Sequence, residues 1–176
     1  MRKKRKKILI DAIRYLSANN IKLEDYTSKN IFSMKPFELR GSEEFIDAVK
    51  FNNYELVKQA IKKDKNYLIQ FDYNQQTAFH WAAKLGYDKI LRLLCENSDK
   101  LSLYDKQLRT PIYLAALFNQ IKCTEILLEY GANAYICDIN GKKPSEVTTN
   151  NKIRNLLNTA DEKFYMEIYN KKNHNE

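Results

Sequence analysis

The sequence predicts an all-α solenoid, in which a short pair of helices is repeated along the chain and each copy packs on the next. Asp72, Asp105 and Asp138 are equally spaced along the chain. Two similar blocks, 77–83 and 110–116, begin at threonines that are separated by the same interval. A fixed period of about 20 to 50 residues is typical of proteins built from stacked structural repeats. The period and the helical patterns that accompany it therefore indicate the fold class.

The first helix of each copy is predicted from the block that opens it. The blocks read Thr-Ala-Phe-His-Trp-Ala-Ala at 77–83 and Thr-Pro-Ile-Tyr-Leu-Ala-Ala at 110–116, and Lys143 and Pro144 begin a third. A threonine hydroxyl can accept a hydrogen bond from a backbone N–H of the first turn, so the threonine of each block is predicted as an N-cap. The prolines at positions 111 and 144 fit the first helical position, where a missing N–H costs nothing.

The second helix of each copy is predicted at 88–94 and at 122–128, where apolar residues recur at i, i+3 and i+4 and so line one buried face. Between the two helices stands Gly86 in one copy, Asn119 in the next and Asn52 in a weaker upstream copy. Glycine and asparagine tolerate positive φ best, so these three residues are predicted to form a left-handed turn.

The first and last copies depart from the central pattern. The upstream copy, 45–57, lacks the Thr-Pro block but keeps the helix pattern. The last copy, 141–157, has a shortened connection and polar substitutions. Terminal repeats of a solenoid are atypical because their outer face meets solvent. We therefore predict a solenoid of about four repeats, in which the first and the last act as caps.

The central blocks resemble the signature of the ankyrin-repeat family, which has a period of about 33 residues and the motif T-P-L-H-x-A. The runs at 88–94 and 122–128 likewise resemble the family's E-I-V-x-L-L-L segment. The chain is therefore similar to ankyrin-repeat proteins over residues 42–158. A basic arm, an amphipathic helix and a linker are expected at 1–41, and a C-terminal helix and tail at 159–176.

The resemblance implies a structural role for several residues. His80 occupies the histidine position of the motif, where its ring is expected to hydrogen-bond backbone between repeats, and Tyr113 fills the same position in the next copy. Gly131 resembles the glycine that stops the second helix. Leu108 stands where the family usually has a hairpin glycine, which is a departure from the pattern.

The resemblance also implies a non-catalytic function, in which a scaffold or adaptor subunit binds a protein partner through the concave face and the hairpin tips of the repeats. Phe51, Leu85 and Phe118 fall at one equivalent position before the interhelical turn, where the family more often has polar residues. Stacking would align them as an exposed apolar row, and such a row usually marks a partner site. The alternative is that the chain's own N-terminal helix or linker covers the row. The predicted partner-binding residues are Phe51, Tyr73, Asn74, Gln76, Lys84, Leu85, Lys106, Gln107, Arg109, Leu117, Phe118, Ile139, Asn140 and Lys142.

Most of the net positive charge lies in an N-terminal arm. The chain has 30 Lys and Arg against 22 Asp and Glu, and without the arm 24 remain against 22. The folded body therefore does not predict a domain-wide nucleic-acid surface. The arm could direct nuclear localisation, bind phosphate or anionic lipid, bind an acidic protein such as tubulin in a ciliary microtubule array, or be a solvated tail. Binding of nucleic acid or an anionic surface through the arm is the alternative function. The arm consists of Arg2, Lys3, Lys4, Arg5, Lys6 and Lys7.

The inventory of reactive residues argues against catalysis. The four glycines form no phosphate-binding loop, and no Ser-His or Cys-His pairing has a supporting motif. Cys95, Cys123 and Cys137 show no CxxC spacing and the two histidines lie at no ligand spacing, so we predict free buried thiols, no metal and no cofactor. No apolar run reaches the length of a membrane span. We expect an intracellular protein in the cytoplasm, with the cytoskeleton or a cilium as the more specific location and the nucleus as the alternative.

Overall fold

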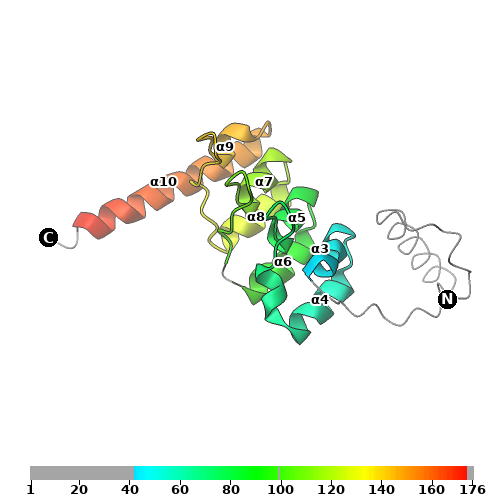
Figure 1. The fold of residues 1–176 in the computed structure, drawn as a ribbon. Coiled ribbons are helices and arrows are strands. Elements are labelled where there is room, and N and C mark those ends of the chain that lie inside the picture. The colour runs from blue at the N-terminus through cyan, green and yellow to red at the C-terminus, as the bar shows by residue number, and fades with distance from the viewer. Residues whose placement is uncertain (1–41, 99, 174–176) are drawn as a thin grey trace, which may run out of the picture. The chain divides into compact units, whose positions relative to one another are not determined.

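The computed structural model describes residues 42–98 and 100–173 of the chain. Within this part, the backbone is a succession of helix pairs, each joined by a tight turn (Figure 1). The predictions for the segment 1–41, including its basic arm and amphipathic helix, lie outside the described residues. The prediction of an all-α solenoid is confirmed, because the described part holds helices and a single isolated bridge between Phe71 and Thr77.

Each repeat consists of a first helix, a turn and a second helix. The first helices, α3, α5, α7 and α9, pack on one another in one layer, and the second helices, α4, α6, α8 and α10, form the other layer (Figure 1). A short 3-10 helix follows α4. The bounds are α3 Ser42–Lys50, α4 Tyr54–Lys63, η2 Lys65–Ile69, α5 Ala78–Leu85, α6 Asp88–Asn97, α7 Pro111–Leu117, α8 Ile121–Glu129, α9 Pro144–Val147 and α10 Asn151–Asn173.

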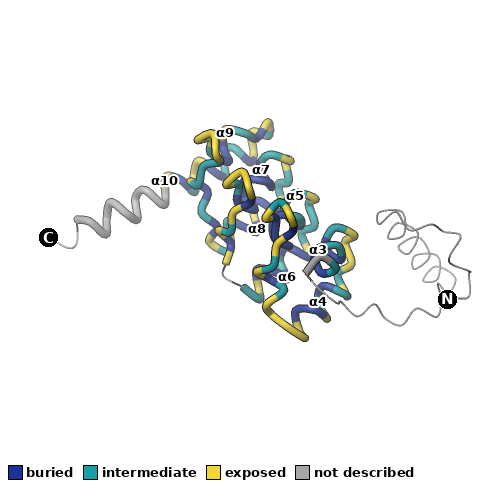
Figure 2. The backbone as a smooth tube through the Cα atoms, viewed as in Figure 1, coloured by how far each residue is buried: buried dark blue, intermediate teal, exposed yellow. Residues whose placement is uncertain are grey.

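The core lies between the two helix layers. The first helices contribute alanines, such as Ala82 and Ala115, and the second helices contribute larger side chains such as Leu91, Leu94 and Leu127, all fully buried. Small residues on one layer let the larger side chains of the other fill the space between helices at the close packing usual for protein interiors. Buried positions therefore concentrate in the helices, while turns and hairpin tips are exposed (Figure 2).

The turns between the helices adopt the predicted left-handed conformation. The φ angles are 54° at Asn52, 75° at Gly86 and 55° at Asn119. A Cβ at position 86 would lie 2.3 Å from Oε1 of Gln120 in the next repeat, so any residue larger than glycine would displace that side chain. The Gln120 amide occupies this space while its Nε2 donates a hydrogen bond to the carbonyl of Lys84 at 3.4 Å. The turn of one repeat is thus in direct contact with the following repeat.

The last repeat differs from the prediction at its C-terminal end. The predicted boundary between residues 158 and 159 falls inside α10, which runs without interruption from Asn151 to Asn173. This helix contains neither glycine nor proline, so no residue in it would favour a break. The expected second helix of the repeat and the expected C-terminal helix are therefore one element.

We expect Gly86→Ala to destabilise the fold more than Gly131→Ala does. Both glycines are left-handed, with φ of 75° and 82°, so an alanine costs about 1 kcal/mol of backbone strain at either position. At Gly131 the added methyl group meets nothing within 4 Å, whereas at Gly86 it displaces the Gln120 amide. The additional loss should be about 0.5–1.5 kcal/mol, the usual contribution of a hydrogen bond, measured by urea unfolding. In a Gln120→Ala background the two glycine variants should lose equal stability, and a persistent difference would contradict this explanation.

Candidate binding surface

The repeated aspartates build the hairpins that connect successive repeats. Oδ1 of Asp72 accepts hydrogen bonds from the backbone N–H groups of Asn74 and Gln76, both at 2.9 Å. Asp105 and Asp138 repeat this pattern with the residues two and four positions later, at 2.9 to 3.0 Å. The carboxylate thus holds the hairpin turn in the way that aspartate side chains commonly stabilise turns. The constant interval between the aspartates is the spacing of these turns.

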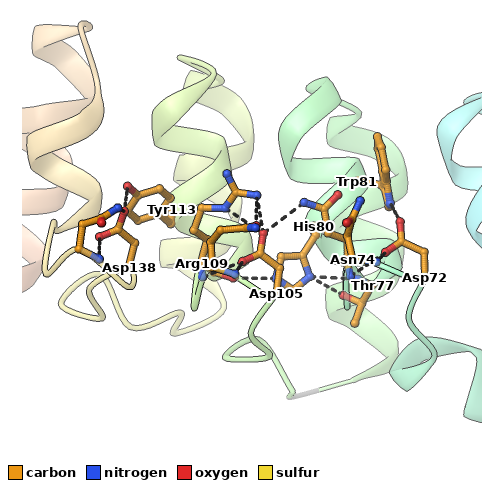
Figure 3. A network of polar contacts seen from close by, with 12 residues as sticks. Asp72, Asn74, Thr77, His80, Trp81, Asp105, Arg109, Tyr113 and Asp138 are labelled. Atoms are coloured by element: carbon orange, nitrogen blue, oxygen red, sulfur yellow. Dashed lines mark hydrogen bonds and ion pairs between the residues drawn. The ribbon is translucent and has the colours of Figure 1, made fainter.

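The second carboxylate oxygen of each aspartate accepts from a donor of the fold, and the donor differs from repeat to repeat (Figure 3). Oδ2 of Asp105 accepts from Nε2 of Gln76 in the preceding repeat at 3.2 Å, and from Nε and Nη2 of Arg109 at 2.8 and 2.6 Å. Burial disfavours the charged form of Asp105, but these hydrogen bonds outweigh it and hold the pKa below its usual value. In the first hairpin, Nε1 of Trp81 donates to Oδ2 of Asp72 at 3.0 Å.

His80 links its own repeat to the next one, as predicted. Its Nδ1 lies 3.1 Å from the Thr77 backbone N and 2.9 Å from the Thr77 hydroxyl, while its Nε2 lies 2.9 Å from the carbonyl oxygen of Arg109. All three contacts are satisfied when Nε2 carries the proton, because Nε2–H then donates to Arg109 and Nδ1 accepts from Thr77. The ring is fully buried, and this burial lowers the pKa of His80.

Tyr113 occupies the equivalent position in the next repeat but reaches a different acceptor. Its hydroxyl donates to Oδ2 of Asp138 at 2.8 Å, one hairpin further along the chain. Burial, together with the hydrogen bond to the carboxylate, raises the pKa of Tyr113, so the phenol stays protonated. The two side chains therefore perform the same task, which is to connect the start of a first helix to the following hairpin.

The three hairpin tips share one conformation even though only one of them, at Gly141, has a residue suited to it. Gln75, Leu108 and Gly141 are all left-handed, with φ of 60°, 58° and 77°. Each donates its backbone N–H to the carbonyl of the hairpin aspartate, at 2.8 to 2.9 Å. Leu108 thus keeps the geometry of the glycine that it replaces, at the cost of a backbone conformation that a leucine rarely adopts.

The predicted partner-binding residues divide into exposed and internal ones. Tyr73 and Ile139, at equivalent hairpin tips, are 80% and 62% exposed, and Phe51, Leu85 and Phe118 of the apolar row are also exposed. Lys106, Gln107, Asn140 and Lys142 are exposed at the tips as well. Asn74, Lys84 and Leu117 are half-buried. The structure assigns no partner to these positions, so their binding role stays a prediction.

Gln76 and Arg109 require a correction. The sequence predicts that Gln76 faces a partner, but it is only 4% exposed and its amide donates to Asp105. Arg109 forms an ion pair with the same carboxylate, with an Nη2 to Oδ2 distance of 2.6 Å. The Gln76 side chain therefore serves the contact between hairpins, and the Arg109 side chain stabilises its own hairpin. The reason is that Asp105 is buried and its charge needs more donors than the turn amides supply.

Four residues of this surface are not among those predicted from the sequence. Trp81 and Lys50 lie beside the apolar row, where the ammonium of Lys50 is 4.7 Å from the centre of the Trp81 ring. Phe71 and Tyr104 are exposed large side chains, each directly before a hairpin aspartate. They are separated by the same interval as the aspartates, and this regularity could have revealed them as surface positions of the hairpins.

The described residues also bear on the predictions for metal sites and thiols. Within 42–98 and 100–173, no group of three or more His, Cys, Asp or Glu side chains could hold a metal ion. Cys95 and Cys123 are buried free thiols, and burial raises the pKa of each to about 12, so both remain protonated. Cys137 is only half-buried, which differs from the expectation of a buried thiol. In the same part of the chain, no helix is long and apolar enough to cross a membrane.

We expect the stability of the fold to fall as the pH decreases below about 6.5, because the unfolded chain then protonates His80 while the folded chain resists it. The slope should reach about 1.4 kcal/mol per pH unit at most, and it should level off once the folded ring is protonated. Denaturant unfolding between about pH 7 and pH 5, above the range of most carboxyl groups, measures it. A His80→Gln chain should show a smaller slope, whereas Tyr113→Phe should lower stability without changing the slope. Equal slopes for His80→Gln and the wild type would contradict the buried neutral ring.

Leu108→Gly should stabilise the protein by about 0.5–1 kcal/mol, because it removes the strain of a left-handed leucine. Leu108→Asn should have a smaller effect of the same sign, since asparagine tolerates this region better than leucine does. Thermal unfolding of the three chains at one pH measures the effect. If both variants lose stability, then the exposed leucine contributes packing that exceeds the backbone strain.

Three comparisons bear on this repeated architecture. Residues 45–138, more than half of the chain, match a family model described as ankyrin repeats in three copies. A segment of 66 residues, 38% of the chain, is 36% identical to an Arabidopsis thaliana protein named as a putative E3 ubiquitin-protein ligase, XBAT31, and covers 14% of it. A segment of 79 residues, 45% of the chain, is 34% identical to the ARF GTPase-activating protein Git of Drosophila melanogaster and covers 10% of it. The chain thus matches only a small part of either relative.

Proposed function

Because the chain belongs to the ankyrin-repeat family, we propose that it is a non-catalytic interaction module whose protein partner binds across the first-helix layer and the hairpin tips. Ankyrin repeats bind protein partners, and the family is generally non-catalytic. The activities named for the two relatives are not transferred, since the matched segments cover 14% and 10% of those proteins.

The observation that carries the proposal is the row of exposed apolar side chains on three consecutive repeats. Phe51, Leu85 and Phe118 are 37%, 37% and 45% exposed. Each stands at the end of a first helix, directly before the turn. Soluble proteins rarely leave contiguous apolar surface exposed without a use for it, and aromatic side chains are frequent anchors of interfaces. The row therefore supports a partner site on this face.

We extend the proposal to a scaffold or adaptor role within a larger complex. The six basic residues of the arm would give such a subunit a second point of attachment, for which an acidic protein surface such as that of tubulin is suited. On this basis we place the protein in the cytoplasm and propose the cytoskeleton or a cilium as its specific site. The alternative function is binding of nucleic acid or an anionic surface through the arm. The experiment below distinguishes it from binding of a protein partner through the repeats.

Co-purification of the full chain with its stoichiometric partners, identified by mass spectrometry, tests the proposed function. The test variant is Phe51→Glu/Leu85→Glu/Phe118→Glu, and the charge-matched control places glutamates at exposed second-helix positions, Gln59→Glu/Asn155→Glu/Asn158→Glu. We expect the test variant to weaken binding of the partner at least about tenfold and the control to leave it unchanged. Circular dichroism of both variants confirms that they fold.

The same purification with residues 1–18 removed separates the arm from the repeats. If a partner survives the test variant but is lost with the arm, the repeats are not the binding surface and the proposed function is wrong. Binding through the arm to nucleic acid would also weaken steeply as salt increases, because each phosphate contact releases counterions. Contacts to the apolar row should depend only weakly on salt.

A further inference from the structure

Two ammonium groups gather around the single tryptophan of the chain, next to the apolar row. Nζ of Lys50 lies 4.7 Å from the centre of the Trp81 ring, and Nζ of Lys84 lies 4.6 Å from it. The Lys84 ammonium is also 5.3 Å from the centre of the Phe118 ring, which belongs to the next repeat. Contacts of this kind between cations and aromatic faces are favourable but modest at exposed sites. Lys50, Trp81, Lys84 and Phe118 together form what we call the lysine–aromatic cluster.

The cluster is held by the fold but is not neutralised by it. The Trp81 ring is fixed by the hydrogen bond from its Nε1 to Asp72. Asp47 forms an ion pair with Lys50, with an Nζ to Oδ1 distance of 3.1 Å. Among the residues that the structure describes, Lys84 forms no ion pair. Two positive charges thus share one ring. Of the two carboxylates beside this ring, Asp47 pairs with Lys50 and Asp72 is hydrogen-bonded to the ring N–H, so neither forms an ion pair with Lys84.

The hairpin tips continue this excess of positive charge. Lys106 and Lys142 form no ion pair with any described acid, and the Lys106 ammonium lies 5.9 Å from the centre of the Tyr73 ring. Among the described residues, no hairpin aspartate forms an ion pair with these lysines, and the carboxylate of Asp105 pairs with Arg109 instead. By contrast, ion pairs do connect neighbouring second helices, where Arg92 pairs with Glu129 at 3.0 Å.

Charge disfavours the basic arm, residues 2–7, as an occupant of the apolar row. The N-terminal arm carries six positive residues and no acid in positions 2–7. Like charges repel, so this arm is a poor match for a surface whose free charges are lysines. An acidic segment of another protein would gain attraction at the same place and would also be drawn toward the surface during encounter.

On the basis of the proposed function, we infer that the partner presents an extended acidic segment to this face. One of its carboxylates binds between Lys50 and Lys84 above Trp81, and its apolar side chains contact Leu85 and Phe118. Neighbouring helices are about 8–10 Å apart. A segment in the extended polyproline II conformation advances about 3.1 Å per residue and presents every third side chain on the same face, so one repeat corresponds to about three residues of the segment. Apolar residues at every third position, with acidic residues between them, therefore fit the row.

A library of short random peptides displayed on phage and selected on the full chain tests this inference. We expect the enriched peptides to be rich in Asp and Glu and to carry apolar residues about three positions apart. Because Trp81 is the only tryptophan, its fluorescence should change saturably when each selected peptide is titrated. Lys50→Gln/Lys84→Gln should weaken these peptides at least about tenfold, whereas the charge-matched control Lys89→Gln/Lys122→Gln should not.

The outcomes separate this inference from the proposed function. The enriched peptides could instead be neutral or basic and fail to bind the Phe51→Glu/Leu85→Glu/Phe118→Glu variant. This result would overturn the inference of an acidic segment but leave the apolar row as the partner site. Acidic peptides whose affinity does not change in Lys50→Gln/Lys84→Gln would also overturn it. Peptides that bind the apolar-row variant as tightly as the wild type, or the absence of any enriched peptide, would count against both. Urea unfolding of the lysine variants controls for loss of the fold.

Discussion

The hairpin carboxylates are the constraint on which the rest of the structure depends. Asp105 is almost fully buried, and a buried charge is tolerated only when hydrogen bonds and opposite charge satisfy it. One oxygen holds the backbone of its own turn, and the other accepts from Gln76 of the preceding repeat and from Arg109. Since the carbonyl of Arg109 in turn accepts from His80, the position of one hairpin fixes the start of the neighbouring first helix. The register of successive repeats follows from this short chain of contacts.

The repeats satisfy the same oxygen with different donors, and this difference gives the surface its individual chemistry. Oδ2 of Asp72 accepts from Trp81, and Oδ2 of Asp138 accepts from Tyr113. Because Trp81 donates a hydrogen bond to the aspartate of its own hairpin, one edge of its ring is held in place. The ring itself remains half-buried beside Lys50 and Lys84. The aromatic face offered to a partner is therefore a by-product of the way in which the first hairpin is closed.

The sequence predicts those features that depend on the residue type at one position. Left-handed turns at Asn52 and Asn119 and the helix stop at Gly131 follow from the conformations that these residues tolerate, and the structure confirms them. The sequence does not predict the burial of Gln76, because its only reason is an acceptor on Asp105, 29 residues later in the chain. The lysine–aromatic cluster escaped prediction for the same reason, since Lys50 and Trp81 meet only when two repeats are stacked. The unbroken α10 was missed because the resemblance to the repeat family ends near residue 158, although no helix-breaking residue accompanies that end.

Residues that maintain the fold and residues that face a partner alternate over short distances in each repeat. Gln76 lies in the hairpin just before α5, and Lys84 lies near the end of the same helix. The Gln76 amide donates to the buried carboxylate of Asp105, whereas Lys84 donates to no buried carboxylate in the described part of the chain. A hydrogen bond from a neutral donor to a buried charge contributes about 1.5–3 kcal/mol, whereas a cation over an aromatic ring contributes about 0.5–1 kcal/mol at an exposed site. The fold therefore constrains Gln76 strongly and Lys84 weakly. Lys84, placed against two rings and beside a second lysine, can therefore be replaced with little loss of stability, so the effect of its replacement on binding can be measured separately from the fold.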